Sequence, residues 1–485
     1  MRTKTVTLLV LFLLTFNFVN SQDQYILIGW NDLGMHCANK NFSKIAVLPP
    51  YNNIFGQLIK KSAGQYPQVI STGFKIEYNI PGNTYSVGKT DFWTYAQQLF
   101  GLASPLPPNI GLTGKGLTGQ LDMNTGYFKA EGIPVTPFQD NNLNTESPFQ
   151  LIHLVARNIS TNVILATTDV VIPVSNEVGC VQSGCHNSEQ AILNSHESVA
   201  GFNQNGPVLC ASCHGSPALG TVGDTVNAKL FSYRIHSTHS FITPTGSINT
   251  CYKCHPGPNT QCLRYVMSQN FSMVCQNCHG TMQNVASTIA AGRKPWIDEP
   301  KCGNTACHGS NYAEESGKIF KQSKGHGGLY CSACHGSPHA ILPSRVANDN
   351  LQNLNLQGHI GTLNNCMVCH STPPAGPGPH GITYTGIKNV TNDVPSAFKL
   401  YQNYPNPFNP STKIKFDVVT KGNSEHISLK IYNILGKEIE TLVNENLSTG
   451  SYEVTWKGES TNSGTYFYKI QIGNFVETKR MVLMK

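Results

Sequence analysis

The sequence is poor in charged residues and has no strong excess of either sign. Asp, Glu, Lys and Arg make up 13% of the 485 residues, and 34 basic side chains against 27 acidic ones leave a net charge of +7. This excess is spread along the chain without a basic run, so we expect no nucleic acid as a partner. Beyond the N-terminus no segment approaches the roughly 18 consecutive apolar residues of a membrane-spanning helix. We therefore expect the mature chain to be soluble or attached to a surface.

The N-terminus carries the pattern of an export signal. Arg2 and Lys4 precede the apolar run of residues 8–14, and a short polar stretch follows that ends at the small residue Ser21. The apolar run is too short to span a bilayer as an anchor. Residues 1–21 are therefore predicted to be a signal peptide, with cleavage after Ser21.

Cysteine, by contrast, is abundant and regularly placed. Of the 16 cysteines, fourteen lie between residues 180 and 369 in seven pairs, and a histidine directly follows the second member of every pair. Five motifs have the form Cys-x-x-Cys-His: Cys210, Cys213 and His214; Cys251, Cys254 and His255; Cys275, Cys278 and His279; Cys331, Cys334 and His335; Cys366, Cys369 and His370. Two motifs have a four-residue spacer: Cys180, Cys185 and His186; Cys302, Cys307 and His308.

This motif is typical of covalent haem attachment. The two thiols form thioethers to the two vinyl groups of one porphyrin, and the adjacent imidazole binds the iron from the proximal side. Zinc ribbons also use paired cysteines, but neither a zinc site nor a disulfide framework requires a histidine after every second cysteine. With only 17 histidines in the chain, seven such placements are not a coincidence. The sequence therefore predicts seven haem c groups.

The sixth ligand of each iron decides between electron transfer and catalysis. The stretch from residue 180 to 380 holds seven further histidines, whereas the rest of the chain holds only His36, His153 and His426. We expect these seven to be the distal ligands, which gives bis-histidine ligation throughout: His196, His236, His239, His326, His339, His359 and His380. Met267 and Met273, just before the fourth motif, are the rival axial ligands, although methionine more often fills packing gaps.

The haem-binding region, residues 176–382, looks duplicated. A four-residue-spacer motif, then CASCHGSPA or CSACHGSPHA, then a third motif occur in the same order twice, with the motif at Cys275 between the two blocks. His339 has no counterpart in the first block. The region lacks sustained periodicity and is rich in Gly, Pro, Ser and Asn, so we expect short helices and loops wrapped around haems that form the core.

Residues 22–175 are predicted to form a β-sandwich-like domain. Alternating segments at residues 25–28, 74–78, 151–155 and 163–166 are separated by Pro, Gly and Asn turns, and a short helix is expected around residues 92–100. Within the segment GWNDLGMHC, the residues Asp32, Met35, His36 and Cys37 could form a metal or redox site, or have a purely structural role. Cys37 and Cys262, the two cysteines outside the motifs, form either a disulfide between domains or two free thiols.

After a polar linker at residues 383–398 the chain becomes β-rich again. Alternating runs at 414–418, 427–432, 452–456 and 465–470 predict an immunoglobulin-like β-sandwich over residues 399–485. The segments YPNPFNPST and NILGKE and the terminal strand resemble a type IX secretion C-terminal sorting domain. That resemblance implies export through the periplasm to the cell surface or the extracellular space, with the type IX secretion machinery as a partner.

The seven motifs resemble those of exported multihaem c-type cytochromes of the extracellular electron transfer kind, and the two longer spacers are similar to those of the cytochrome c3-like group. GWNDLGMHC and NTYSVGKTDFWTYAQQLFG resemble an N-terminal module of such proteins. The resemblance implies electron transfer without enzymatic activity, with other cytochromes or extracellular electron acceptors as partners. The alternative is a multihaem reductase of a small oxyanion or a nitrogen or sulfur compound at one open haem. Such reductases often replace a motif His by Lys, and all seven motifs here end in His. The sequence is also compatible with a homo-oligomer or a haem filament, and with a surface-binding role for the N-terminal domain.

Overall fold

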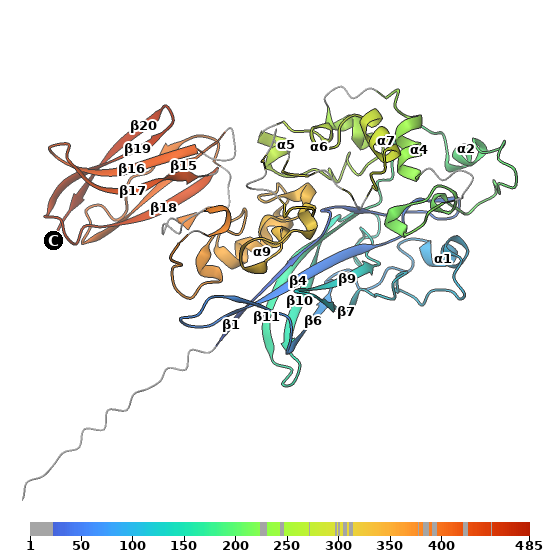
Figure 1. Ribbon diagram of the computed structural model, residues 1–485, viewed down its shortest axis with the longest axis horizontal. Coiled ribbons are helices and arrows are strands. Elements are labelled where there is room, and N and C mark those ends of the chain that lie inside the picture. The colour runs from blue at the N-terminus through green and yellow to red at the C-terminus, as the bar shows by residue number, and fades with distance from the viewer. Residues whose placement is uncertain are drawn as a thin grey trace, which may run out of the picture.

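The protein was analysed as a computed structural model (Figure 1). The structure describes residues 23–223, 230–242, 247–270, 272–295, 298, 301–303, 308–309, 314–376, 378–381, 388–389, 395–420, 425–447 and 449–485. The predicted signal peptide, Cys307 and most of the predicted linker lie outside these residues. Among the described residues, no helix has both the length and the apolar character needed to cross a membrane.

Two five-stranded sheets form the N-terminal part. The first has the order β1-β4-β9-β8, with β5 also paired to β4, and consists of β1 (Gln24–Trp30), β4 (Asn52–Lys61), β5 (Gln68–Ile70), β8 (Asp122–Asn124) and β9 (Tyr127–Ile133). The second has the order β2-β11-β10-β6-β7, from β2 (His36–Cys37), β6 (Phe74–Asn79), β7 (Thr118–Gln120), β10 (Phe149–Asn158) and β11 (Ile164–Ser175). The one helix within this part, α1, spans Phe92–Phe100 as the sequence predicted.

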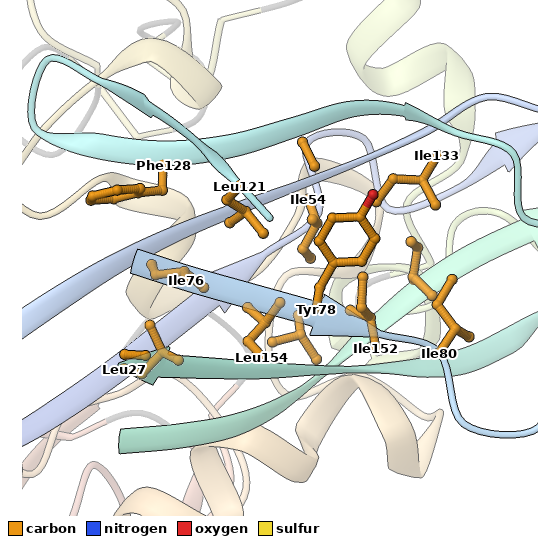
Figure 2. Close-up of a cluster of buried hydrophobic side chains, with 14 of the residues drawn as sticks. Leu27, Ile54, Ile76, Tyr78, Ile80, Leu121, Phe128, Ile133, Ile152 and Leu154 are labelled. Carbon is orange, nitrogen blue, oxygen red and sulfur yellow. The ribbon is translucent and has the colours of Figure 1, made fainter. Parts of the chain in front are cut away.

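The two sheets share one apolar core (Figure 2). Alternate residues of β10 are buried, so Ile152 and Leu154 point inward while their neighbours point out. They meet Ile54 of β4 and Leu27 of β1 from the opposite sheet. The predicted β-sandwich-like arrangement is therefore present.

The C-terminal part is a second pair of sheets, each of four strands, around a core that includes Trp456 and Tyr468. One sheet has the order β13-β18-β15-β14, from β13 (Lys388–Asn389), β14 (Lys399–Leu400), β15 (Ser411–Val418) and β18 (Gly450–Lys457). The other has the order β17-β16-β19-β20, from β16 (Glu425–Asn433), β17 (Glu438–Leu447), β19 (Gly464–Ile472) and β20 (Phe475–Leu483). Each of the four alternating runs of the sequence lies within one of these strands.

Between the two β-rich parts the described chain forms short helices and loops, as predicted. The α-helices are α2 (Glu189–Asn194), α3 (Cys210–Cys213), α4 (Phe231–Thr238), α5 (Val266–Asn270), α6 (Cys275–His279), α7 (Met282–Ala290), α8 (Cys331–His335) and α9 (Ala347–Gln357). The 3-10 helices are η1 (Pro217–Leu219), η2 (Ile248–Lys253), η3 (Phe320–Gln322), η4 (His326–Gly328), η5 (Pro338–Ala340), η6 (Cys366–Val368) and η7 (Pro379–Gly381). The predicted duplication is visible locally, because α3 followed by η1 matches α8 followed by η5.

This middle region packs on the N-terminal sheets (Figure 1). The outer face of β1 and β4 forms a second apolar cluster, in which Trp30 and Ile59 meet Ala333 of α8. The first half of the region is attached separately, since β12 (Val208–Leu209) pairs in parallel with β3 (Ile45–Ala46). Part of the core that the middle region needs is thus supplied by the N-terminal domain.

Candidate functional site

Each Cys-x-x-Cys-His motif lies on a short helical turn that presents all three side chains on one side. In the motif at Cys210, the backbone N–H of His214 donates to the carbonyl of Cys210 at 3.0 Å, as in one turn of helix. Residues i, i+3 and i+4 of a helix share one face, so two thiols and an imidazole point the same way. The four-residue spacer of the first motif forms a wider turn, in which the N–H of His186 donates to the carbonyl of Cys180 at 3.2 Å.

Six of the seven motif histidines face one of the predicted distal histidines. The ring centres of these pairs are separated by 5.9 to 6.3 Å: His186 and His239 at 6.1 Å, His214 and His196 at 6.3 Å, His255 and His236 at 6.1 Å, His279 and His339 at 6.3 Å, His335 and His380 at 5.9 Å, and His370 and His326 at 6.0 Å. His308 and His359 are the two predicted ligands that are not among these twelve histidines. Met267 and Met273 belong to none of them.

Many of the distal candidates are fixed by a backbone carbonyl. Nδ1 of His196, His236 and His239 lies 3.1, 2.7 and 2.9 Å from the carbonyl oxygen four residues earlier in the chain. A carbonyl oxygen can only accept, so the proton must be on Nδ1 and Nε2 keeps its lone pair. Nδ1 of His339 and His359 is held in the same way, by Leu33 at 3.0 Å and Ile360 at 2.9 Å. This tautomer is the one that a metal-binding Nε2 requires.

Burial keeps several of the motif imidazoles neutral. Desolvation, with the charge of a neighbouring histidine as a further cause, lowers the pKa of His255, His279 and His335 to about 4. Desolvation lowers the pKa of His236 as well. Because the neutral imidazole is the form that binds iron, these side chains are ready to act as ligands near pH 7.

Neighbouring motifs lie close together. The thiols of Cys251 and Cys275 share a hydrogen bond, which lowers the pKa of Cys251 to about 7 and raises that of Cys275. The backbone carbonyl of Cys254 accepts from the N–H of Gly179, directly before the first motif, at 3.2 Å. Burial, with smaller contributions from Cys369 and Cys331, raises the pKa of Cys334 to about 12. The motifs at Cys180, Cys251 and Cys275 are therefore neighbours, as are those at Cys331 and Cys366.

The donor set fits a row of haems. With metal–imidazole bonds of about 2 Å on both sides and each ring centre about 1.2 Å beyond its nitrogen, two imidazoles on one iron have ring centres about 6.4 Å apart. The six observed separations, 5.9 to 6.3 Å, lie within about 0.5 Å of this value. Within the described part of the chain, no group of three or more His, Cys, Asp or Glu side chains is arranged to hold a single metal ion.

The GWNDLGMHC segment contains a buried polar pair. His36 and Asp32 form a buried pair, with Nε2 to Oδ1 at 2.8 Å, and Asn53 donates to the other carboxylate oxygen at 2.9 Å. Cys37 and Cys262 are free thiols in this structure, but burial and the charge of Cys262 together raise the pKa of Cys37 to about 12. The two cysteines are thus neighbours across the contact between the domains.

Sequence reasoning missed the polar residues that join the domains. Arg264 and Asp349 form an ion pair in which both side chains are almost fully buried, with Nε to Oδ2 at 2.7 Å and Nη2 to Oδ1 at 2.8 Å. Arg264 also donates through Nη1 to the carbonyl of Gly34. A single Arg in a loop and a single Asp in a helix carry no recognisable spacing, so no pattern could have indicated this pair.

Comparison with known proteins gives one informative match, at the C-terminus. No curated protein matches the chain. A solved structure of dimeric latent PorU from Porphyromonas gingivalis aligns with 95% of this chain and 34% of its own at 9% identity and a TM-score of 0.15, which is too low to carry any argument. Residues 402–484 match the family of secretion system C-terminal sorting domains. The protein therefore carries a type IX sorting domain, which indicates export to the cell surface or the extracellular space through the type IX secretion machinery.

Proposed function

We propose that this protein is an exported multihaem cytochrome that transfers electrons through seven covalently attached haems. The single observation that carries the proposal is the facing of six motif histidines by six further histidines at ring separations of 5.9 to 6.3 Å. Such spacing serves a pair of imidazoles on opposite sides of one iron. Haem c, when bound, supplies one-electron redox chemistry.

The chain's own residues would attach, ligate and shield the haems. The fourteen motif cysteines would form the thioethers, and the motif histidines would be the proximal ligands. The distal ligands would be the partner histidines of the six pairs, and His359 is the remaining candidate for the His308 haem. Imidazoles on both sides leave an iron no open position for a substrate, which favours electron transfer over the reductase alternative.

Electron exchange between sites depends on how closely the chain places them. The hydrogen bond between the thiols of Cys251 and Cys275 and the contact of Gly179 with Cys254 bring three of the first four motifs together. In the second block, the carbonyl of Cys334 accepts from the N–H of Leu363 at 3.0 Å, three residues before the motif at Cys366. Other cytochromes or extracellular acceptors are the proposed redox partners.

The haem count and the spin state of the irons test this proposal together. We expect the mature protein to show seven haems by pyridine haemochrome assay and mass, and low-spin iron by low-temperature electron paramagnetic resonance (EPR). The variant His326→Ala should convert one of the seven irons to high spin, because it removes the ring that lies 6.0 Å from His370.

A matched control is His153→Ala, which removes a histidine that pairs with Asp169 at 2.7 Å on the N-terminal sheet. This variant should leave all seven irons unchanged. A colourless mature protein would refute the proposal outright. A wild-type protein with a high-spin iron that binds and reduces nitrite or a similar small oxyanion would instead support the reductase alternative.

A further inference from the structure

The GWNDLGMHC segment of the N-terminal domain contacts one of the candidate haem ligands directly. Nδ1 of His339 lies 3.0 Å from the backbone carbonyl oxygen of Leu33, and the ring of His339 faces that of His279 at 6.3 Å. Because the carbonyl can only accept, this contact puts the proton on Nδ1. The ring of His339 also shares a hydrogen bond with the thiol of Cys262.

This contact differs in origin from those of the other histidines. His196, His236 and His239 each use the carbonyl four residues earlier in their own helical turn, and His359 uses that of the next residue. Among these five histidines, only His339 is oriented by a residue 306 positions away in the sequence. Its orientation therefore depends on the docking of two domains and not on local helix geometry.

The loop that carries the Leu33 carbonyl is shaped by one buried side chain. The amide oxygen of Asn31 accepts from the N–H of Leu33 at 3.2 Å and from that of Gly34 at 2.8 Å. Its amide nitrogen donates to the side chain of Asn52 and the carbonyl of Asn53, both at 2.8 Å. Asn31 is 1% exposed, so these four bonds tie the turn to the sheet with little competition from water.

Residues of the middle region also hold the segment around His339 in place. Oγ of Ser337 donates to the carbonyl of Asn31 at 2.7 Å, and the N–H of Arg264 donates to the carbonyl of His339 at 3.1 Å. The turn leaves no spare room, because a Cβ added at Gly34, where φ is +85°, would lie 3.1 Å from Cβ of Ser337. Loop and ligand segment are thus fixed against each other from both sides.

We infer that the Asn31–Gly34 turn is a positioning element for His339, so that the N-terminal domain sets the orientation and proton position of one iron ligand. The inference rests on the proposed function. An imidazole whose second nitrogen donates to a fixed acceptor is a stronger and better oriented ligand, and loss of such a partner changes the properties of the metal. The effect should be confined to the haem of the Cys275 motif.

The test is Asn31→Ala in the full-length mature protein, with EPR and redox titration of all seven haems. We expect the seven haems to be retained, while one low-spin signal changes its g values or turns high-spin and one of the seven potentials shifts. Hydrogen–deuterium exchange should rise in the peptide that contains residues 337–340. Seven haems with the wild-type spectrum, potentials and exchange would overturn the inference while leaving the proposed function intact. Absence of haem in the wild type would remove both.

The matched control is Asn83→Ala in the same domain. Asn83 is fully buried and hydrogen-bonds Thr136, Gln150 and Lys89, each at 2.8 Å. The variant Asn83→Ala should destabilise the sandwich and leave every haem signal unchanged. An equal spectral change in Asn31→Ala and Asn83→Ala would contradict the inference. If Asn31→Ala fails to fold, Ser337→Ala removes only one bond to the turn and should shift the same signal by a smaller amount. An unchanged signal in Ser337→Ala would then count against the inference.

Discussion

The ion pair of Arg264 with Asp349 lies within the middle region, where Arg264 also contacts the N-terminal domain, and it offers a sharp test of how this contact is held. The two side chains are 0% and 1% exposed and meet through two parallel hydrogen bonds of 2.7 and 2.8 Å. The guanidinium group also donates to the carbonyls of Gly34 and Cys262 and lies 4.8 Å from the ring of Phe149. The variant Asp349→Asn keeps the shape of the side chain but leaves the buried positive charge of Arg264 without its counter-ion.

The expected cost is large because neither charge can be solvated by water. Breaking a buried pair by removing one partner typically destabilises a protein by about 3–5 kcal/mol. An exposed pair typically contributes only about 0–1 kcal/mol. Lys129 and Glu131 form such a pair at 2.7 Å with side chains 27% and 41% exposed, so Glu131→Gln is the matched control. The two charge-neutralising variants should therefore differ by several kcal/mol.

The assay is urea unfolding of the mature protein followed by circular dichroism, with the free energy of unfolding taken from midpoint and slope. We expect Asp349→Asn to lose about 3–5 kcal/mol and Glu131→Gln to lose less than about 1 kcal/mol. The double variant Arg264→Met with Asp349→Leu, which removes both charges, should recover part of the loss. Equal losses in the two single variants would refute the reasoning, because the buried pair would then behave like one in water.

Three further changes test other parts of the molecule. Gly29→Ala should destabilise by about 1–3 kcal/mol in the same urea assay, because the added Cβ would lie 2.6 Å from Leu154; an unchanged midpoint would contradict the close approach of the two sheets. Burial alone would raise the pKa of Asp140. Hydrogen bonds from Lys89 and Thr84 outweigh this effect and hold the pKa below its ordinary value. A carboxyl with a depressed folded-state pKa contributes stability above the unfolded pKa of about 3.9, and this contribution is lost as the pH falls through the folded pKa. Asp140→Asn should therefore be less stable than wild type at pH 7, and the difference should shrink as the pH falls below about 3.9. Deletion of residues 402–484 should leave the protein in the periplasm, as measured by cell fractionation, whereas continued surface display would show that another signal directs export.

The sequence allowed the candidate ligands to be named but not to be paired. Covalent attachment requires two thiols and an imidazole within a few residues, so the motifs are visible as local spacing. The candidate distal histidines were predicted only from their enrichment in the same stretch. Which of them faces which motif depends on the tertiary structure. His339, for example, has no counterpart in the first block. In the structure its ring lies opposite that of His279, which belongs to the Cys275 motif.

Among the strands, too, some could be predicted from the sequence and others could not. The strands whose residues alternate between core and solvent, such as β6 and β10, were predicted from their period of two. Strand β4 was not, because seven of its ten residues are buried and these lie on both faces of the strand. One face carries Ile54 and Leu58 into the sandwich core, and the other carries Ile59 toward α8. A strand covered on both sides has no polar face to reveal it.

The doubly covered strands explain how so irregular a middle region can be held in place. Its motif helices span one or two turns, too short to be stable without tertiary contacts. The apolar run Ile26-Leu27-Ile28 of β1 provides those contacts, because Leu27 enters the sandwich core while Ile26 and Ile28 join the cluster that contains Ala333 of α8. The second block of motifs is therefore built on the outer face of a sheet that folds on its own core. In this arrangement the sandwich acts as the frame on which α8 is held, because the same two strands contribute to the sandwich core and to the cluster that contains Ala333.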